Sequence, residues 1–115
     1  MQINLLVIRS KNADSLALQY EQLGMKFDYH KHGNGPFHYA AEFNGQVFEI
    51  YPLPAENTTS ETKIRLGFEV EEIEATIDLL SNTNWIILSQ IKVSDYGKIA
   101  IIQDLDGRKI ELKNK

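Results

Sequence analysis

The 115-residue sequence is long enough for one small globular domain, or for two half-domains around one core. It has 12 basic and 16 acidic residues, a formal net charge of −4 and no cysteine. This charge balance, without a cluster of Lys or Arg, is atypical of proteins that bind nucleic acid or a membrane surface. The absence of cysteine excludes disulfides, zinc–thiolate sites and cysteine nucleophiles.

The sequence has no apolar run near the roughly 20 residues of a membrane-spanning helix. The apolar run at residues 3–8 has no positively charged leader before it, unlike a signal peptide. We therefore expect a cytoplasmic protein that contacts neither membrane nor nucleic acid.

A strand and a helix open the sequence. The β-branched and leucine-rich residues 3–8 are typical of a buried strand. Asn12 can cap a helix over residues 13–23, and Gly24 can end it. One face of this helix is apolar, at Leu16, Tyr20 and Leu23.

Three strands are predicted to follow in the first half. The first covers residues 25–32 and ends at the turn 33–36. The other two cover residues 37–43 and 46–51. They flank Asn44-Gly45, which is the strongest short signal for a β-hairpin.

The pattern restarts after a polar, proline-containing linker at about residues 53–62. Strand, helix and three strands are expected at residues 64–70, 71–80, 85–89, 98–103 and 109–113, with Ile73, Ile77 and Leu80 on one helix face. Glu49 and Glu111 are separated by 62 residues, as are the turn glycines Gly45 and Gly107. This register indicates an internal duplication, with module 1 at about residues 1–52 and module 2 at about 63–115.

Strand parity predicts which side chains share a face. Directly opposed residues of a two-residue hairpin point the same way, which places His38, Glu49 and Tyr51 on one polar face. In the second half, Arg65 and Glu111 point away from the core in the same manner. The opposite face of the first hairpin is apolar and is expected to pack on the helix: Phe37, Tyr39, Ala41, Phe43, Phe48 and Ile50.

The three histidines allow two interpretations. His30 and His32 place two imidazoles on one strand face, and His38 can lie across the turn from them. Three such nitrogens can form a metal site. An exposed polar rim on a hairpin needs no ion, and we favour the rim.

The sequence resembles the vicinal oxygen chelate superfamily, which includes glyoxalase I, bleomycin-resistance proteins and extradiol dioxygenases. The most specific matching segment is the ending YGKIAIIQDLDGRKIEL. The others are LLVIRSKNADSLALQYEQLGMKF, NGQVFEIY and IRLGFEVEEIEATIDLL, so the resemblance spans nearly the whole chain. It implies an α+β fold, a single glyoxalase-like domain of two βαβββ modules whose mixed sheets curve around a cleft. It also implies a homodimer.

The resemblance implies where a metal would bind. Metal-dependent members have four ligand positions: His or Gln on the first strand, Glu on the fourth, His on the fifth and Glu on the eighth. By motif these positions fall here on Leu5 (or Asn4), Glu49, Arg65 and Glu111. Leucine has no lone pair, and arginine has no acceptor and stays protonated. We therefore expect no metal, with Arg65 neutralising the two glutamates.

The resulting functional prediction is a metal-independent protein that binds or sequesters a small molecule. The predicted ligand-binding residues are His38, Glu49, Tyr51, Arg65 and Glu111, and Arg65 either holds an anionic ligand or only balances the glutamates. The alternative is a metal-dependent lyase, isomerase or dioxygenase-like enzyme. It would use Glu49 and Glu111 as catalytic residues or as ligands of Zn, Ni, Mn or Fe. A third function is that of an interaction module or regulator whose cleft is filled by its own side chains.

Aromatic residues give two further expectations. Tyr51, Trp85 and Tyr96 can stack on a planar ligand, although a tryptophan at a strand start is more typical of a core or a dimer interface. By analogy with the superfamily, residues 93–97 are a candidate loop over the cleft.

Overall fold

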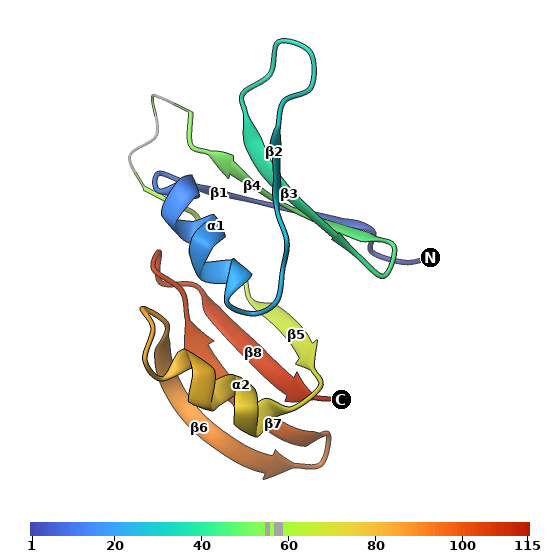
Figure 1. Ribbon diagram of the computed structural model, residues 1–115, viewed down its shortest axis with the longest axis vertical. Coiled ribbons are helices and arrows are strands. Elements are labelled where there is room, and N and C mark those ends of the chain that lie inside the picture. The colour runs from blue at the N-terminus through green and yellow to red at the C-terminus, as the bar shows by residue number, and fades with distance from the viewer. Residues whose placement is uncertain (55, 57–58) are drawn as a thin grey trace. The chain divides into compact units, whose positions relative to one another are not determined.

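In the computed structural model, two similar modules follow one another along the chain (Figure 1). The structure describes residues 1–54, 56 and 59–115, so part of the predicted linker lies outside the described residues. The chain divides into two compact units, Met1–Glu61 and Thr62–Lys115. In its described residues, each unit has one helix and a four-stranded mixed sheet in the order βαβββ, which confirms the predicted α+β fold class.

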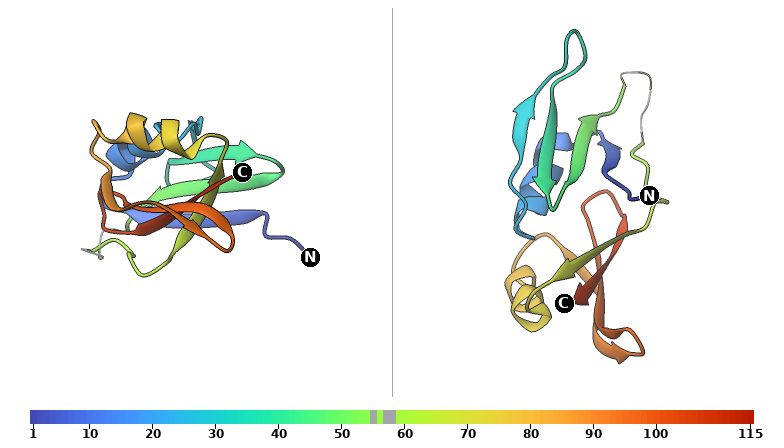
Figure 2. Two further views of the ribbon diagram at one scale, coloured as in Figure 1. Left: turned by 90° about the horizontal axis from the view of Figure 1, so that it is seen from below. Right: turned by 90° about the vertical axis from the view of Figure 1, so that its right-hand side faces the viewer.

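The first unit is a sheet with one helix on one face; in the right-hand view of Figure 2, the helix lies behind the strands. The strand order is β1-β4-β3-β2, and only the β1–β4 pair is parallel. Its elements are β1 (Leu5–Ser10), α1 (Ala13–Glu21), β2 (Asp28–His30), β3 (His38–Phe43) and β4 (Gln46–Pro52).

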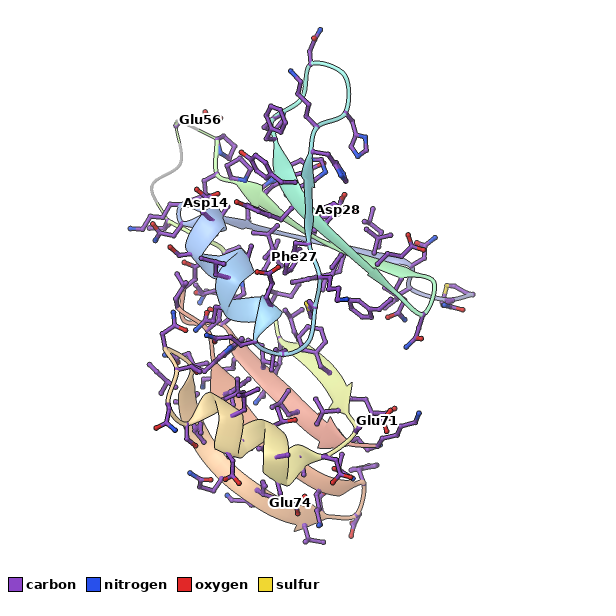
Figure 3. The ribbon with its side chains drawn as sticks, in the orientation of Figure 1. Asp14, Phe27, Asp28, Glu56, Glu71 and Glu74 are labelled. Carbon is purple, nitrogen blue, oxygen red and sulfur yellow. The ribbon has the colours of Figure 1, made fainter. Side chains whose placement is uncertain are left out.

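The core of the first unit lies between α1 and the apolar face of the sheet. Leu16 and Tyr20 on α1 are completely buried, and the Tyr20 ring lies 5.3 Å from the ring of Phe48 on β4. Phe27, labelled in Figure 3, extends this cluster, with its ring 6.2 Å from that of Phe48. Burial of each such side chain stabilises the fold by about 1.5–3 kcal/mol.

The second unit repeats this arrangement with the strand order β5-β8-β7-β6. The predicted face of α2 is buried at Ile73, Ile77 and Leu80, and it covers a sheet whose central strand buries Ile110 and Leu112. The elements are β5 (Leu66–Val70), α2 (Ile73–Leu80), β6 (Ile86–Ser94), β7 (Gly97–Gln103) and β8 (Lys109–Asn114).

The cap of α1 differs from the prediction. Within the described residues, the Asn12 side chain makes no cap hydrogen bond, and the Asn12 backbone N–H donates to Ser10 Oγ at 3.0 Å. The start of α2 is capped from the end of the chain instead, where Asn114 Oδ1 accepts from the Ile73 N–H at 2.8 Å. No helix among the described residues is long and apolar enough to cross a membrane.

Several helix and strand boundaries differ from the prediction by one or two residues, and those of two strands differ by more. The strand expected at residues 25–32 is only Asp28–His30, because it pairs with β3 alone over three residues. The strand expected at residues 85–89 continues to Ser94, because β7 supplies partners as far as the Ser94–Gly97 pair. Residues 93 and 94 therefore belong to a strand, and the expected loop reduces to a hairpin turn.

Trp85 and Tyr96, two of the three aromatic residues predicted to stack on a ligand, lie in different surroundings. Trp85 is 4% exposed and belongs to the core of the second unit. Tyr96 lies in the β6–β7 turn and is 80% exposed. The core interpretation of the tryptophan is therefore the correct one.

Candidate functional site

Polar side chains gather on the face of the first sheet that points away from α1. His30 on β2 lies opposite His38 on β3, and Ala40 on β3 lies opposite Glu49 on β4. The same parity places Tyr51 on this face, beside His38. Residues predicted from parity to share a face therefore lie together here.

His38 has polar contacts at both ring nitrogens. Its Nε2 lies 3.2 Å from Glu49 Oε2, and its Nδ1 lies 3.2 Å from the carbonyl oxygen of Pro36. The ring stacks on Tyr51, and the guanidinium of Arg9 lies 5.6 Å from the Tyr51 ring centre. Neighbouring strands and Tyr51 thus hold the imidazole in one orientation.

All three histidines of the sequence gather beside Glu49. The ring centres lie 4.7 Å apart for His30 and His38, 4.9 Å for His30 and His32, and 5.1 Å for His32 and His38. One potential ligand atom from each histidine and one from Glu49 all lie within 4.8 Å of one another. We refer to these four residues as the histidine cluster.

The prediction of an exposed histidine rim is wrong for one member of the cluster. His38 is only 1% exposed, because β2 and β4 flank it and Tyr51 covers its ring. His30 is half-buried, and only His32 is exposed. Strand parity could place the three rings on one face, but it could not show that they lie in contact.

In the second unit, Glu111 occupies the position that Glu49 has in the first. Glu49 is aligned with Val7 on the parallel strand β1, and Glu111 is aligned with Gly67 on β5. Arg65 is exposed and directly precedes β5. Within the described part of the second unit, no ion pair joins Arg65 to Glu111. Neutralisation of Glu49 by Arg65 stays a prediction.

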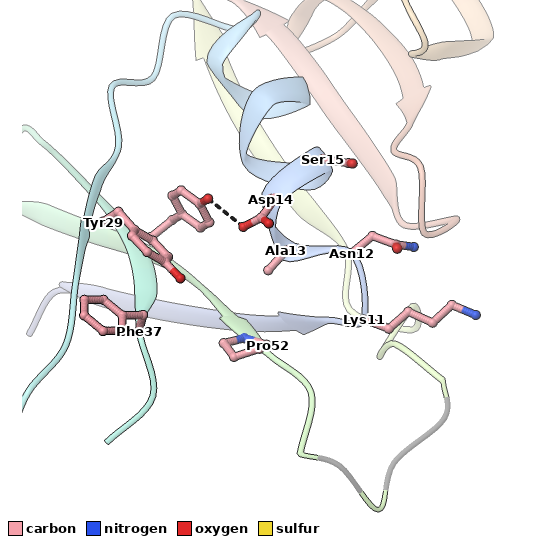
Figure 4. A pocket seen from close by; sticks show the side chains of 9 residues that line it. Lys11, Asn12, Ala13, Asp14, Ser15, Tyr29, Phe37 and Pro52 are labelled. Atoms are coloured by element: carbon pink, nitrogen blue, oxygen red, sulfur yellow. Dashed lines mark hydrogen bonds between the residues drawn. The ribbon is translucent and has the colours of Figure 1, made fainter. Parts of the chain in front are cut away.

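A pocket of about 350 Å³ opens on the α1 side of the first sheet (Figure 4). Three aromatic rings form one wall. The ring centre of Tyr29 lies 5.1 Å from that of Phe37, with planes 20° from parallel, and 4.6 Å from that of Tyr39. The rest of the lining comes from residues 11–15 and Pro52. We refer to this site as the aromatic pocket.

Tyr39 joins the aromatic wall to α1. Its hydroxyl donates to Asp14 Oδ1 at 2.6 Å, as Figure 4 shows. This hydrogen bond, together with burial and the negative charge of Asp14, raises the pKa of Tyr39 to about 12. The phenol therefore stays protonated at neutral pH and keeps donating to the carboxylate.

Sequence reasoning missed this pocket. Tyr39 packs under α1 as predicted, but Tyr29 and Phe37 are 57% and 47% exposed. Helix α1 begins beside Tyr39, so it does not cover the rings of Tyr29 and Phe37. The alternation of aromatic residues at positions 37 and 39 signals a shared face, but it carries no information on where the helix begins.

Comparison with known proteins rests on structure, because the sequence matches no protein-family profile and no curated protein. The antibiotic-binding protein TnmS3 from Streptomyces sp. CB03234 is similar with a TM-score of 0.77 and 16% identity, over 99% of this chain and 95% of that chain. A glyoxalase/bleomycin resistance protein/dioxygenase family enzyme from Burkholderia phytofirmans PsJN gives 0.76 and 13%, over 99% and 98%. This chain has the vicinal oxygen chelate fold. The oxidase ChaP-H2 is similar too, with 0.75 and 16% over 100% and 94%.

The residues at the superfamily's metal positions do not fit that metal centre. Parallel pairing aligns Leu5 with Val47, two residues before Glu49, and therefore places Leu5 on the face of Glu49. Arg65 holds the equivalent place before β5. Neither side chain has a lone pair to donate, so only Glu49 and Glu111 keep ligand chemistry. The vicinal oxygen chelate fold is thus present with an altered set of side chains.

Proposed function

We propose that this protein binds a planar, polar aromatic molecule in the aromatic pocket, without the metal centre of the vicinal oxygen chelate superfamily. The observation that carries the proposal is the stacked pair Tyr29 and Phe37, which remains half-exposed in a pocket of about 350 Å³. Small-molecule sites typically have volumes of about 300–1,000 Å³ and are lined by aromatic side chains. A planar ligand would cover these rings and remove their apolar surface from water.

The polar edge of the pocket indicates what else the ligand would carry. Asp14 Oδ1 already accepts from Tyr39, but a carboxylate has further lone pairs that can accept from a ligand N–H or O–H. The Lys11 side chain extends away from the rings in Figure 4. A donor-bearing neutral or cationic aromatic compound therefore suits the pocket better than an anionic one.

The similarity in fold to an antibiotic-binding protein supports small-molecule binding as the general function. His38, Glu49, Tyr51, Arg65 and Glu111 stay a predicted second ligand set. Residues of the first unit in that set lie on the sheet face opposite the aromatic pocket, so the two candidates can be separated by experiment. Metal independence, a homodimer and a cytoplasmic location also stay predictions.

The test is an NMR titration of the untagged, ¹⁵N-labelled protein with a panel of planar quinones, polyphenols and heteroaromatic amines. We expect saturable shifts at the amides of residues 13–15, 29, 37 and 39. Because an aromatic pair is worth about 0.5–1.5 kcal/mol beyond its buried area, Tyr29→Ala and Phe37→Ala should each weaken binding about tenfold.

The control is Tyr96→Ala, which removes a more exposed tyrosine from the second unit and should leave the affinity unchanged. Chemical-shift changes confined to the amides around His38 and Glu49 would show that the ligand binds on the other face of the sheet. Equal affinities in the two pocket variants and the wild type would also exclude the aromatic pocket as the site.

A further inference from the structure

We propose that the histidine cluster, His30, His32, His38 and Glu49, binds one divalent transition-metal ion. This site lies within the first module and shares only Glu49 with the four metal positions of the superfamily. It does not depend on the proposed function, because the aromatic pocket lies on the other face of the sheet.

The spacing of the donors fits a four-coordinate ion. Bonds from zinc to imidazole nitrogen or carboxylate oxygen measure about 2.0–2.2 Å, so tetrahedral ligand atoms lie about 3.3–3.6 Å apart. His38 Nε2 and Glu49 Oε2 are 3.2 Å apart, which already matches one edge of that tetrahedron. The remaining ligand atoms lie within 4.8 Å. Rotation of the exposed His32 side chain can close part of that distance.

The hydrogen bonds of His38 leave a place for a cation. The Pro36 carbonyl oxygen can only accept, so His38 Nδ1 carries a proton and donates to it. In a neutral imidazole, Nε2 then has a lone pair that faces the carboxylate of Glu49. Two acceptors at this distance need a positive charge, either a proton on Nε2 or a metal ion. Metal-binding histidines usually donate their other N–H to a carbonyl or carboxylate, as His38 does.

His30 favours a metal ion over a proton. Its Nε2 is buried and has no hydrogen-bond partner among the described residues. A proton shared between His38 and Glu49 leaves that nitrogen unsatisfied, and unpaired buried polar atoms are rare in folded proteins. An ion beside the His38 ring, whose centre is 4.7 Å from that of His30, can accept a lone pair from both imidazoles.

The second module is an internal comparison that lacks the imidazoles. Its register is equivalent, and Glu111 keeps the carboxylate. The positions equivalent to His38 and His30, however, are occupied by Ile99 and Lys92, which pair with each other across β6 and β7. The cluster is therefore a feature of the first module and not of the repeated fold.

The donor set indicates the class of metal. Three imidazoles and one carboxylate suit Zn²⁺, Co²⁺, Ni²⁺ or Cu²⁺, whereas Ca²⁺ and Mg²⁺ prefer oxygen ligands only. The ligands come from β2, the following loop, β3 and β4. Four protein ligands leave no open position on a tetrahedral ion, so the ion would act as a structural clamp on the β2–β3 hairpin.

The test uses the full, untagged chain, since a histidine tag would itself bind metal. Metal content after dialysis against Zn²⁺, measured by mass spectrometry, should be one ion per chain. Co²⁺ should replace it and give the strong visible absorption of a tetrahedral site. Calorimetric titration should show that His38→Ala and His32→Gln each weaken Zn²⁺ binding about a hundredfold or more. Loss of an outer partner alone typically costs about 10–100-fold.

Two carboxylate variants make the result specific. Glu42→Gln changes an exposed residue on the same face of β3 and should leave Zn²⁺ affinity unchanged. Glu111→Gln should also leave it unchanged, and a loss there would overturn the proposal in favour of a centre of the superfamily type. His32 is exposed, so His32→Gln keeps the test valid if His38→Ala does not fold.

Two other results would overturn the proposal. One is a wild-type chain that takes up none of Zn²⁺, Co²⁺ and Ni²⁺. The other is an unchanged affinity in both histidine variants. Tyr29→Ala, which weakens the aromatic pocket, should not alter metal content, so failure of either proposal can be recognised separately.

Discussion

The ring of His38 lies flat on the ring of Tyr51, with centres 4.0 Å apart and planes 8° from parallel. This contact covers an imidazole that is only 1% exposed, next to its Glu49 partner. The stack therefore has two effects: it adds aromatic contact, and it keeps water from the contact between His38 Nε2 and Glu49 Oε2.

Replacement of Tyr51 by alanine should destabilise the first unit. We expect Tyr51→Ala to lower the free energy of unfolding by about 1–3 kcal/mol, since it removes both ring contact and cover. Urea denaturation followed by circular dichroism measures this. Tyr96→Ala, at an 80% exposed site, is the control and should change stability by less than about 0.5 kcal/mol. Equal effects of the two substitutions would contradict the role of the stack.

The Tyr39–Asp14 hydrogen bond should be visible in a spectroscopic titration. The pKa of Tyr39 is raised from 10.0 to about 12, chiefly by this bond. Asp14→Asn should therefore return the pKa of Tyr39 towards 10.0. Ultraviolet absorbance of tyrosinate measures it, and Tyr39→Phe identifies which step belongs to this residue.

The same shift has a consequence for stability. A phenol with a higher pKa in the folded state contributes stability that is complete below pH 10.0, the value in the unfolded chain. That contribution is lost as the pH rises through about 12. If the pKa of Tyr39 is unchanged in Asp14→Asn, the Asp14 carboxylate is not the cause of the raised pKa.

The two helices differ in their caps, and the same substitution can compare them. Asn114→Ala removes the acceptor for the Ile73 N–H and should cost about 0.5–2 kcal/mol. Asn12→Ala removes a side chain that makes no cap bond within the described residues and should cost much less. Thermal and urea unfolding of both variants give the comparison. A larger loss for Asn12→Ala would reverse the assignment of the caps.

Local patterns were sufficient for much of the fold. Helix faces at 3.6-residue spacing and strand parity depend on near neighbours along the chain, so Leu16 and Tyr20, or His38 and Glu49, could be placed correctly. The hairpin at Asn44-Gly45 was predictable for the same reason, since Asn44 adopts the left-handed conformation at φ 53° that this turn requires.

The features that were missed depend on distant contacts or on how far an element extends. The cap of α2 joins residues 41 apart in the sequence, and the aromatic pocket depends on where α1 begins over the sheet. Arg108 is a further case, because charged residues in a turn usually lie on the surface. It is fully buried, with its Nη1 3.2 Å from Asp104 Oδ2 and 2.8 Å from Asp106 Oδ2.

Strand β2 is three residues long and, among the strands that the structure describes, pairs with β3 alone. Such an edge segment opens locally at a lower free energy than the centre of the sheet, so its amide protons exchange early. Tyr29 on β2 points toward the aromatic pocket, and its neighbour His30 points to the opposite face, toward the histidine cluster. Each opening of β2 therefore disrupts both faces together. A ligand in the aromatic pocket or an ion in the histidine cluster would each slow amide exchange in β2, and so would also stabilise the site on the opposite face.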